Sequence, residues 1–413
     1  MTTPWNYRYA LRTEGMGSSV IRELLKLTEL ADVISFAGGL PAPELFPVER
    51  FRQAADKVLR EHGPKALQYS ATEGYLPLRR FVVDRMSRYG IKAREDNVLI
   101  TSGSQQALDL IGKLLVNPGD KILTENPTYL GALQAWRSYQ ARYVTVPVDQ
   151  LGMRTDLLAD ALRAGPKFMY VLPNFQNPSG VTLALERRLQ LVRMADDHGI
   201  PIVEDDPYGQ LRYSGDHIPP LVVLDYDHLE GRAVNGQGFF AGNVIYTSTF
   251  SKTLAPGLRL GWIVAPVDVV QRCVQVKQGM DLHTSTFNQI IAFEVARDGF
   301  LDEHVSKIRE VYAFRRDVML EAMEGYFPEE VTWTKPDGGL FLWVQLPDGL
   351  DAAELLEDAV GRHRVAFVPG SAFDPGDKGN NTMRLNFSNA QPDQIEQGIR
   401  RLGTVLKEHL VPA

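Results

Sequence analysis

From about residue 98, short apolar runs alternate with longer segments of helical periodicity, and this alternation restricts the fold more than any other feature. Of the segments between the runs, residues 104–115 carry apolar side chains at helical spacing, and residues 186–199 end on a glycine stop. The apolar runs are VLIT (98–101), KILT (121–124), YVTVPV (143–148), FMYVLP (168–173), PIVED (201–205), VIYTSTF (244–250) and GWIVAP (261–266). Strands that alternate with helices predict an α/β fold, here a mainly parallel seven-stranded sheet covered by helices on both faces.

The two ends of the chain have a different pattern. SSVIRELLKLTEL (18–30) predicts a short amphipathic helix, a Gly/Pro-rich loop follows, and a second helix is expected over about 48–61. After a helical stretch at roughly 268–325, TWTKPDGGLFLWVQL, VAFVPG and TMRLNFSN predict the strands of a small α+β domain. We expect three parts: an N-terminal helix and loop (1–45) that belong to the small domain and cover the active site, a large domain (46–300) and a small C-terminal domain (301–413).

Composition excludes several classes of protein. The 413 residues carry a net charge of −7, which argues against a general nucleic-acid or anionic-membrane surface. The single cysteine, Cys273, lies in VVQRCVQVKQ and is expected to be a small buried apolar residue rather than a nucleophile. No run of about 18 apolar residues predicts a membrane span, and the N-terminus has no signal-peptide pattern, so we expect a cytoplasmic protein. We predict no metal site.

Polar and glycine residues gather where four of the predicted strands end. Because the carboxyl ends of parallel strands meet at one edge of a sheet, these segments are expected to form one crevice. The four are TSGSQQ (101–106), PNFQNPSG (173–180), EDDPYG (204–209) and STFSK (248–252). In the first, Ser104 and Gln105 open a helix whose N-terminus favours an anion, although a helix cap by Ser102 or Ser104 explains the same residues. Arg259 is either a phosphate ligand or an ordinary surface arginine.

Lys252 and Asp205 each raise the question of a buried charge. A lysine at the end of a buried strand is costly unless its amine is paired, solvated or deprotonated. If Asp205 is buried, it also needs a cationic partner, which Lys252 or a protonated ring nitrogen of a ligand would supply. The alternative interpretation is that Asp205 and Asp206 are simply two carboxylates in a turn. Together, these groups predict pyridoxal 5′-phosphate (PLP) as the ligand. They offer a cradle for a phosphate, a carboxylate for a pyridinium nitrogen, an Asn and a Tyr for a phenolate, and a lysine for an aldehyde.

The sequence resembles the PLP-dependent transferases of fold type I, and within them the class I/II aminotransferases. It is most similar to the branch of 2-aminoadipate (LysN-type), kynurenine and broad-specificity aminotransferases. The motifs that carry the resemblance run from about residue 34 to 388 and are SFAGGLPAPELFP, ALQYSATEGY, TSGSQQALDL, ENPTYLGA, NFQNPSG, VEDDPYG, STFSKTLAPGLRLGW, KQGMDLHTSTFNQ, PDGGLFLWVQL and MRLNFS. The large domain (46–300) is then the PLP-binding domain.

The resemblance implies a role for each matching residue. Lys252 forms the Schiff base with the cofactor and, once freed, moves a proton between the substrate Cα and C4′. Asp205 pairs with the pyridine nitrogen, while Asn177 and Tyr208 bind the phenolate oxygen. The ring stacks on Tyr129. The phosphate is held by Ser104, Gln105, Ser251 and Arg259, with Thr249 as a further candidate and Tyr69 reaching the site of the neighbouring subunit of a homodimer.

The resemblance also implies the substrate contacts. Arg384 clamps the α-carboxylate, assisted by Asn177 and Gly39. Arg22 either binds a distal carboxylate of the substrate or is a solvated residue on a helix face. If it swings away, the contacts to an apolar or aromatic substrate come from Leu40, Tyr75 or Phe387. We expect ping-pong transamination from an L-amino acid (2-aminoadipate, aromatic, branched-chain or glutamate-like) to a 2-oxo acid such as 2-oxoglutarate.

Two other functions remain open at this stage. One is lyase, decarboxylase or racemase chemistry on the same fold with the same cofactor. Arg384 and the intact NPSG sequence favour transamination over these. The other is a non-catalytic PLP-binding regulatory module, but about 30 residues before the AGGLP loop are too few for a winged-helix DNA reader.

Overall fold

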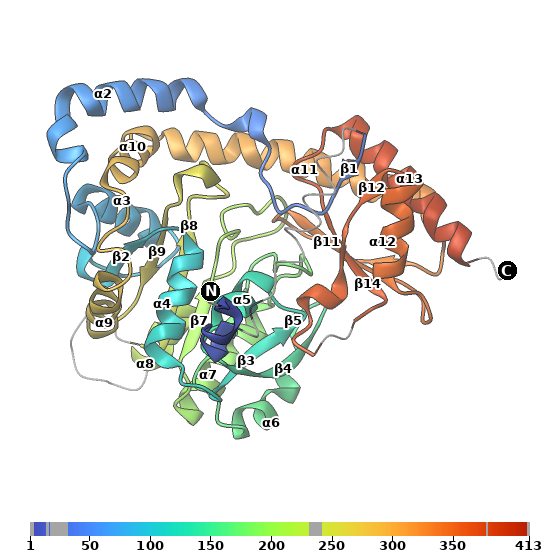
Figure 1. Ribbon diagram of the computed structural model, residues 1–413, viewed down its shortest axis with the longest axis horizontal. Coiled ribbons are helices and arrows are strands. Elements are labelled where there is room, and N and C mark those ends of the chain that lie inside the picture. The colour runs from blue at the N-terminus through green and yellow to red at the C-terminus, as the bar shows by residue number, and fades with distance from the viewer. Residues whose placement is uncertain (1–3, 14–15, 17–31, 231–241, 377–378, 411–413) are drawn as a thin grey trace.

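The computed structural model describes residues 4–13, 16, 32–230, 242–376 and 379–410 (Figure 1). The predicted helix at 18–30, with Arg22, lies outside the described residues. Among the described helices, none is both long enough and apolar enough to cross a membrane.

The centre of the large part is an eight-stranded sheet with the order β2-β9-β8-β7-β6-β3-β4-β5. Its core of neighbouring strands β8, β7, β6, β3 and β4 is parallel, whereas β9 is antiparallel to both β2 and β8. The strands are β2 (Val98–Thr101), β3 (Lys121–Asn126), β4 (Arg142–Asp149), β5 (Gly152–Met153), β6 (Met169–Val171), β7 (Ile202–Asp205), β8 (Val244–Thr249) and β9 (Gly261–Val264). All seven predicted strands are present. The eighth, β5, is a two-residue return of the chain after β4, too short to produce a sequence pattern.

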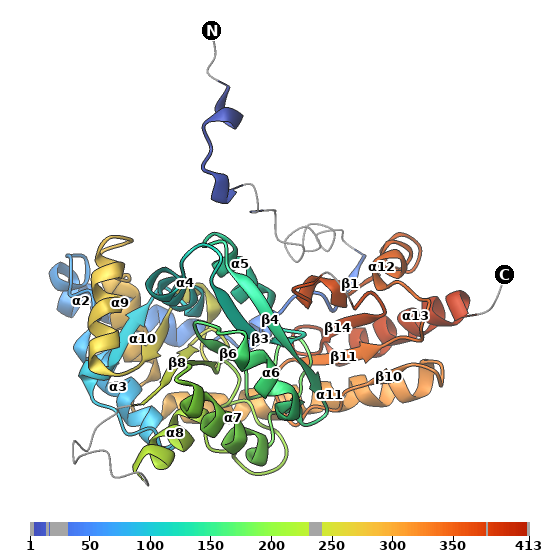
Figure 2. The same cartoon turned by 90° about the horizontal axis from the view of Figure 1, so that it is seen from below.

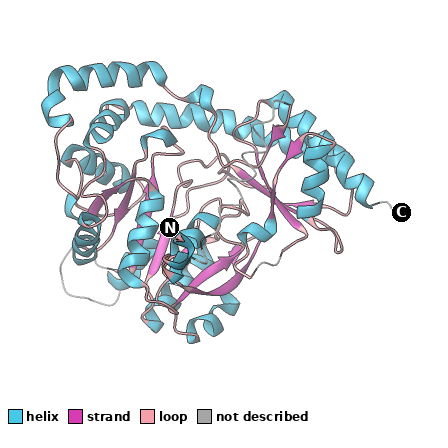
Figure 3. Cartoon of the chain, in the orientation of Figure 1, coloured by secondary structure: helices cyan, strands magenta, loops and turns pink. Residues whose placement is uncertain are grey.

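Helices cover both faces of this sheet (Figures 1 and 3), as the sequence predicts. Alternate residues of a strand point to opposite faces, and so Leu99 and Ile122 pack in one apolar cluster, Val98 and Leu123 in the other. The first cluster is closed by α4 (Ser104–Leu115), α5 (Leu130–Arg137) and α9 (Val267–Gln278). The second is closed by α2 (Val48–Ala66), α3 (Leu76–Ser87), α6 (Leu158–Arg163), α7 (Leu185–His198), α8 (Leu221–Glu230) and α10 (Thr286–Ala296).

Three local expectations can be compared with the structure. Helix α7 ends where expected, because Gly199 takes the left-handed conformation (φ 63°) that caps it. Helix α2 runs past the predicted end at residue 61, since Gly63 and Pro64 fall inside its last turns rather than stopping it. Cys273 is buried in α9, and burial raises the pKa of its thiol to about 12, which makes it a packing residue rather than a nucleophile.

A smaller sheet forms the second part of the molecule. Its antiparallel strands have the order β10 (Thr332–Trp333), β11 (Phe341–Gln345), β14 (Thr382–Asn386) and β13 (Val368–Pro369), and α12 (Ala352–Gly361) and α13 (Pro392–Leu410) pack on it. Near the N-terminus, β1 (Ile34–Ser35) pairs in parallel with β12 (Val365–Ala366). The long helix α11 (Phe300–Tyr326) contributes to the cores of both parts and links them (Figures 1 and 2). The predicted domain boundaries at 45/46 and 300/301 remain predictions.

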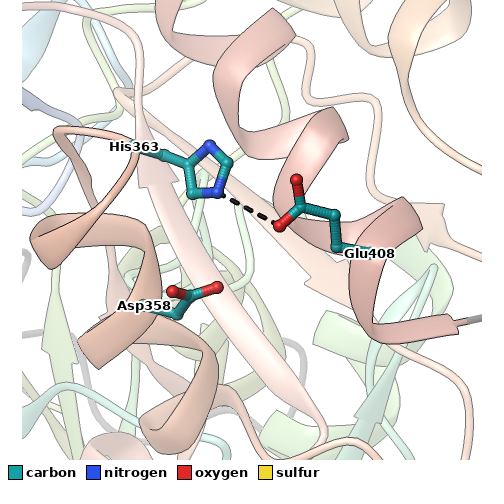
Figure 4. Close-up of side chains that lie close together, drawn as sticks. All are labelled: Asp358, His363 and Glu408. Carbon is teal, nitrogen blue, oxygen red and sulfur yellow. Dashed lines mark ion pairs between the residues drawn. The ribbon is translucent and has the colours of Figure 1, made fainter. Parts of the chain in front are cut away.

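The C-terminal ends of α12 and α13 are joined by a charged cluster of Asp358, His363 and Glu408 (Figure 4). His363 Nε2 lies 3.3 Å from Glu408 Oε2, and His409 Nε2 lies 3.0 Å from Asp358 Oδ2. Arg362 donates to both carboxylate oxygens of Asp358. Because these contacts already engage the carboxylates, we interpret the cluster as an ion-pair network that holds the two helices together, and we assign no metal to it.

Candidate active site

A cavity of about 520 Å³ opens at the carboxyl ends of the parallel strands. The four segments that the sequence placed there all contribute to its wall. The predicted residues that line it are Gly39, Ser104, Gln105, Tyr129, Asn177, Asp205, Tyr208, Thr249, Ser251, Lys252, Arg259 and Arg384. The fold therefore brings together side chains that are spread over almost 350 residues of sequence.

Lys252 enters the cavity from the turn after β8. Its Nζ donates a hydrogen bond of 2.6 Å to the carbonyl oxygen of Gly39, which comes from the loop after β1. Burial, together with the positive charges of Arg384 and Arg259, lowers the pKa of the Lys252 amine to about 8. No carboxylate among the described residues forms an ion pair with this amine. A neutral fraction is thus available near physiological pH, as a nucleophile or a base requires.

Asp205 ends β7 at the floor of the cavity and is almost fully buried. The two neighbouring strands hold its carboxylate: Tyr170 of β6 donates to Oδ2 at 2.8 Å, and Thr247 of β8 donates to Oδ1 at 3.0 Å. Burial raises the pKa of Asp205 to about 6, against the opposing effect of these two donors. A buried carboxylate in this state is stabilised as an anion by a cationic group placed against it.

Arg384 is a fully buried guanidinium on β14. It donates to Asn177 Oδ1 at 2.7 Å and to the carbonyl oxygen of Ala37 at 2.6 Å, and its Cζ lies 4.3 Å from the ring centroid of Phe341. Its Nε has no hydrogen-bond partner among the described residues, and no described carboxylate pairs with it. Burial lowers its pKa to about 10. A carboxylate in the cavity would supply the missing counter-charge.

A turn suited to an anion also borders the cavity. Helix α4 starts at Ser104, preceded by Gly103 with φ 83°, and Ser104 and Gln105 of its first turn line the cavity. A Cβ on Gly103 would lie 2.7 Å from Nη2 of Arg259, and one on Gly261 would lie 2.6 Å from the Ser104 nitrogen. Both glycines are therefore needed for the guanidinium and the helix end to approach each other.

Two aromatic residues complete the wall. Tyr129 precedes α5, and Gly131 leaves room for its ring, because a Cβ there would lie within 2.6 Å of the ring atoms. Tyr208 is buried and packs edge-on against Phe341, with ring centroids 5.9 Å apart. Burial raises the pKa of Tyr208 far above its usual value, so it acts as a neutral hydroxyl donor.

Some predicted residues lie elsewhere. Tyr69 is 79% exposed, outside the cavity, with its ring 5.9 Å from that of His283. Of the three suggested contacts to an apolar substrate, Leu40 lines the cavity, whereas Tyr75 and Phe387 do not. Phe387 is fully buried in the core of the smaller part, so the expectation for it was wrong. Tyr75 packs against Phe293 outside this cavity, and its contact with a substrate stays a prediction. Arg22 lies outside the described residues.

Sequence reasoning missed Gln134, Leu172 and Phe341, which also line the cavity. Phe341 opens the predicted strand in PDGGLFLWVQL, but it and Leu342 are both apolar and both buried, so the local sequence does not distinguish the cavity residue from the core residue. Gln134 lies one helical turn beyond Leu130, and nothing in the local sequence distinguishes it from an exposed residue of α5.

A comparison with known families and structures identifies the family and the fold. The sequence model of the family described as aminotransferase class I and II matches residues 31–402. The chain belongs to this family. A curated relative, the aromatic-amino-acid aminotransferase 1 of Thermococcus litoralis, is 45% identical to this aminotransferase over 99% of the chain and 96% of the relative.

Two solved structures are similar over the whole molecule. One is LysN, the α-aminoadipate aminotransferase of Thermus thermophilus complexed with N-(5′-phosphopyridoxyl)-L-leucine (TM-score 0.90, 42% identity, 99% of both chains). The other is the kynurenine aminotransferase of Pyrococcus horikoshii in complex with PMP (TM-score 0.90, 43% identity, 99% of both chains). This aminotransferase is thus a PLP-dependent transaminase of the predicted α/β fold.

The residues of the cavity fit PLP by their own chemistry. An amine with a lowered pKa suits the cofactor aldehyde, and the buried Asp205 carboxylate suits a protonated ring nitrogen. The glycine-dependent turn at Ser104 with Arg259 suits a phosphate. Each of the three chemically distinct ends of the cofactor has a matching group in one cavity.

Proposed function

We propose that this aminotransferase accepts L-amino acids of several side-chain classes, namely 2-aminoadipate, aromatic, branched-chain and glutamate-like ones, and donates the amino group to 2-oxoglutarate. The observation that carries the proposal is Arg384, a buried guanidinium without a carboxylate partner among the described residues. It supports binding of the α-carboxylate common to all these substrates. The similar enzymes named above act on aromatic amino acids, α-aminoadipate and kynurenine, which supports a broad range.

The bound cofactor supplies the chemistry of an electron sink and of a carrier for the amino group between two half-reactions. Within the chain, Asp205 would hold the ring nitrogen in its protonated form. Asn177 and Tyr208 would donate to the phenolate oxygen, and the buried environment strengthens both hydrogen bonds. Ser104, Gln105, Ser251 and Arg259 would hold the phosphate, with Tyr129 against the ring.

Lys252 would act as the proton carrier. Its lowered pKa of about 8 leaves a neutral fraction that takes the proton from the substrate Cα and returns it at C4′. Arg384 and Arg259 both disfavour its cationic form, so the same charges that bind the two anionic ends of the reactants also keep the base available.

The wall that meets the substrate side chain is mixed in character. Leu40 and Phe341 offer apolar surface, while Gln134 offers an amide that donates to a distal carboxylate or hydroxyl. Such a wall supports acceptance of both apolar and polar side chains. A role for Arg22 in reading a distal carboxylate stays a prediction.

The active unit is proposed to be a homodimer in the cytoplasm. The high exposure of Tyr69 supports the idea that it serves the phosphate site of a partner subunit. The 3₁₀ helices at Trp5–Tyr7 and Leu11–Thr13 also expose large apolar side chains, Trp5, Tyr7 and Leu11, which is typical of a surface that a partner covers. The single buried cysteine is typical of a reducing compartment.

A single-turnover absorbance experiment tests the reaction. The purified enzyme is mixed with 2-aminoadipate, glutamate, aspartate, leucine, valine, phenylalanine, tyrosine or kynurenine, and the cofactor band is followed before and after 2-oxoglutarate is added. We expect several donors to discharge the band and 2-oxoglutarate to restore it, with no change in Lys252→Ala. Recovery of the band without any added 2-oxo acid would support lyase or decarboxylase chemistry, because these reactions do not leave the amino group on the cofactor. No discharge by any donor would refute the enzymatic function.

Co-expression of two defective subunits tests the shared site. If Tyr69 serves the partner's site, a mixed dimer of Tyr69→Ala and Lys252→Ala subunits has one site with both defects and one intact site. Activity should then exceed that of either variant alone. Activity no higher than the sum of the two homodimers would contradict the shared site.

A further inference from the structure

A second cavity, of about 640 Å³, lies at the junction of the two parts of the molecule. Its wall is formed by residues of the segments 150–151, 180–184 and 212–218 of the large part and by residues of the segment 332–345 of the smaller part. Its size is within the range of small-molecule sites, and it exceeds the 520 Å³ of the active-site cavity. We call it the junction cavity; none of the residues with a predicted role in transamination lines it.

Two indole side chains give the junction cavity flat apolar walls. Trp333 of β10 and Trp343 of β11 both line it. The Trp333 ring is fixed edge-on against Phe327, and the Trp343 ring edge-on against Phe373. The Nε1 of Trp333 is buried and has no hydrogen-bond partner among the described residues. Because this nitrogen is shielded from solvent, a ligand in the cavity does not reach it, and the two indoles contribute ring surface only.

A guanidinium with spare donors lines the same cavity. The side chain of Arg212 is only 12% exposed, and its nearest carboxylate, Asp337, is 3.9 Å away. Its hydrogen bond to the described residues goes to the carbonyl oxygen of Ser214 at 3.1 Å, and its Cζ stacks over Phe175. Burial lowers the pKa of Arg212, while the negative charges of Asp337, Asp216 and Asp206 oppose this shift. Asp337 also lines the cavity, at a distance too long for a hydrogen bond, so an anionic group closer to the guanidinium would add the acceptors that Asp337 does not provide.

From this arrangement we propose that the junction cavity is a second binding site, for a monocarboxylic acid carried on a planar aromatic ring. The ring lies against the two tryptophans, and the carboxylate accepts from Arg212. Neither an aliphatic chain nor a free inorganic anion uses both features. The site is distinct from the substrate site, where Arg384 is the carboxylate-binding residue.

A short chain of contacts connects the junction cavity with Arg384. Thr334, which lines it, donates through Oγ1 to the carbonyl oxygen of Ser179 at 2.8 Å and accepts from the Trp343 nitrogen at 3.0 Å. Trp343 stands directly opposite Arg384 in the pairing of β11 with β14. Ser179 follows two residues after Asn177, which accepts from Arg384. A bound acid therefore acts on the elements that position the substrate clamp, and it changes the KM for the amino donor without competing with it.

The test uses indole-3-acetate, which has neither an amino nor a 2-oxo group and is not turned over. Binding to the holoenzyme is measured by calorimetry and by quenching of tryptophan fluorescence. Loss of charged hydrogen bonds predicts that Arg212→Gln weakens binding at least about tenfold, and loss of part of the aromatic contact surface predicts about 2- to 10-fold weakening in Trp333→Phe. Lys335→Gln, at the rim and paired with Glu324, should change binding less than about twofold.

Three further measurements distinguish binding at the junction cavity from binding at the substrate site and from non-specific binding. Arg384→Gln should keep the binding, because the second site does not use that residue. Hexanoate and sulfate should bind at least about tenfold more weakly than indole-3-acetate, because they lack the ring contacts. Inhibition should be mixed with respect to the amino donor. Binding that disappears in Arg384→Gln and survives in both Arg212→Gln and Trp333→Phe would overturn the proposal, as would no detectable binding or equal binding of sulfate. Since Trp333→Phe keeps the ring, it remains informative if Arg212→Gln is unstable.

Discussion

Arg384 and Asn177 are joined by a hydrogen bond of 2.7 Å, although they are 207 residues apart and belong to different parts of the molecule. Arg384 lies on β14 of the smaller sheet, and Asn177 lies in the segment after β6 of the large sheet. The contact therefore fixes the predicted substrate clamp relative to the predicted cofactor ligand. A movement of the two parts relative to each other would therefore affect the positions of both Arg384 and Asn177.

The first prediction concerns this clamp. Arg384→Gln removes a buried charge that would pair with the substrate α-carboxylate, a change worth about 2–5 kcal/mol, or roughly a 30- to 5,000-fold loss in kcat/KM. Cofactor binding should persist, because the phosphate and ring-nitrogen contacts remain. Steady-state kinetics with and without added PLP measure both effects. Arg60→Gln, an exposed helix residue, is the matched control. Unchanged kcat/KM in Arg384→Gln would refute the role.

Substitution of the neighbouring carboxylates Asp205 and Asp206 is predicted to affect different properties, namely activity for Asp205 and stability for Asp206. Asp205 faces the cavity, whereas Asp206 accepts from Asn174, Gly209 and Tyr246 at 2.9–3.0 Å and is not among the lining residues. Asp205→Asn should lower kcat by at least about 100-fold, the lower range for a positioned acid–base or electrostatic group, with little change in melting temperature. Asp206→Asn should mainly destabilise the fold, by about 1.5–3 kcal/mol for a charge-assisted hydrogen bond.

Urea unfolding and single-turnover kinetics on both variants separate the two effects. The prediction fails if Asp206→Asn loses activity while keeping full stability, or if Asp205→Asn remains as active as the wild type. A shared loss of both properties in both variants would mean that the pair acts as one structural unit.

A third prediction concerns Lys277, a fully buried lysine behind the anion-binding turn. Its Nζ donates to Gln106 at 2.6 Å and to both carboxylate oxygens of Asp281 at 2.8 and 2.9 Å. Gln106 and Asp281 in turn hold Ser102, at the start of the turn. Lys277→Met leaves a negative charge next to the phosphate site, so the PLP dissociation constant should rise about tenfold or more, as for a lost buried charged hydrogen bond.

Reconstitution of the cofactor-free protein, followed by absorbance, measures this affinity. The double variant Lys277→Met/Asp281→Asn removes the uncompensated charge, and it should recover part of the affinity. Lys57→Met, which breaks a lysine–glutamate pair far from the turn in sequence, should bind PLP like the wild type. Equal affinity in Lys277→Met and the wild type would contradict the idea that this pair positions the turn.

The residues that the sequence located well are those that follow strands. Asp205, Asn177 and Lys252 could be placed in one crevice because parallel strands bring their carboxyl ends to one edge, whatever the details of packing. Phe341 escaped, since it reaches the cavity through the pairing of β11 with β14, which no local pattern encodes. Phe387 was misplaced for the same reason: residues near Arg384 in sequence alternate between the two faces of the small sheet. Whether Gln134 lines the cavity depends on how the short helix α5 is rotated about its axis relative to Tyr129.

The last prediction concerns the pH dependence of stability of the cofactor-free protein. Burial lowers the pKa of Lys252 from 10.5 in the unfolded chain to about 8 in the folded one. Below pH 8 both states are protonated, and the folded state bears the full cost of the buried charge. Between pH 8 and 10.5 the unfolded chain binds more protons, so this cost falls as pH rises, by at most about 1.4 kcal/mol per pH unit. Lys252→Met should therefore be more stable than the wild type at pH 7, and its advantage should shrink between pH 8 and 9.5. Urea unfolding of both cofactor-free proteins measures the difference, with Lys407→Met on the surface as the control. An advantage that stays constant over this range would show that the amine is not held in a lowered-pKa state.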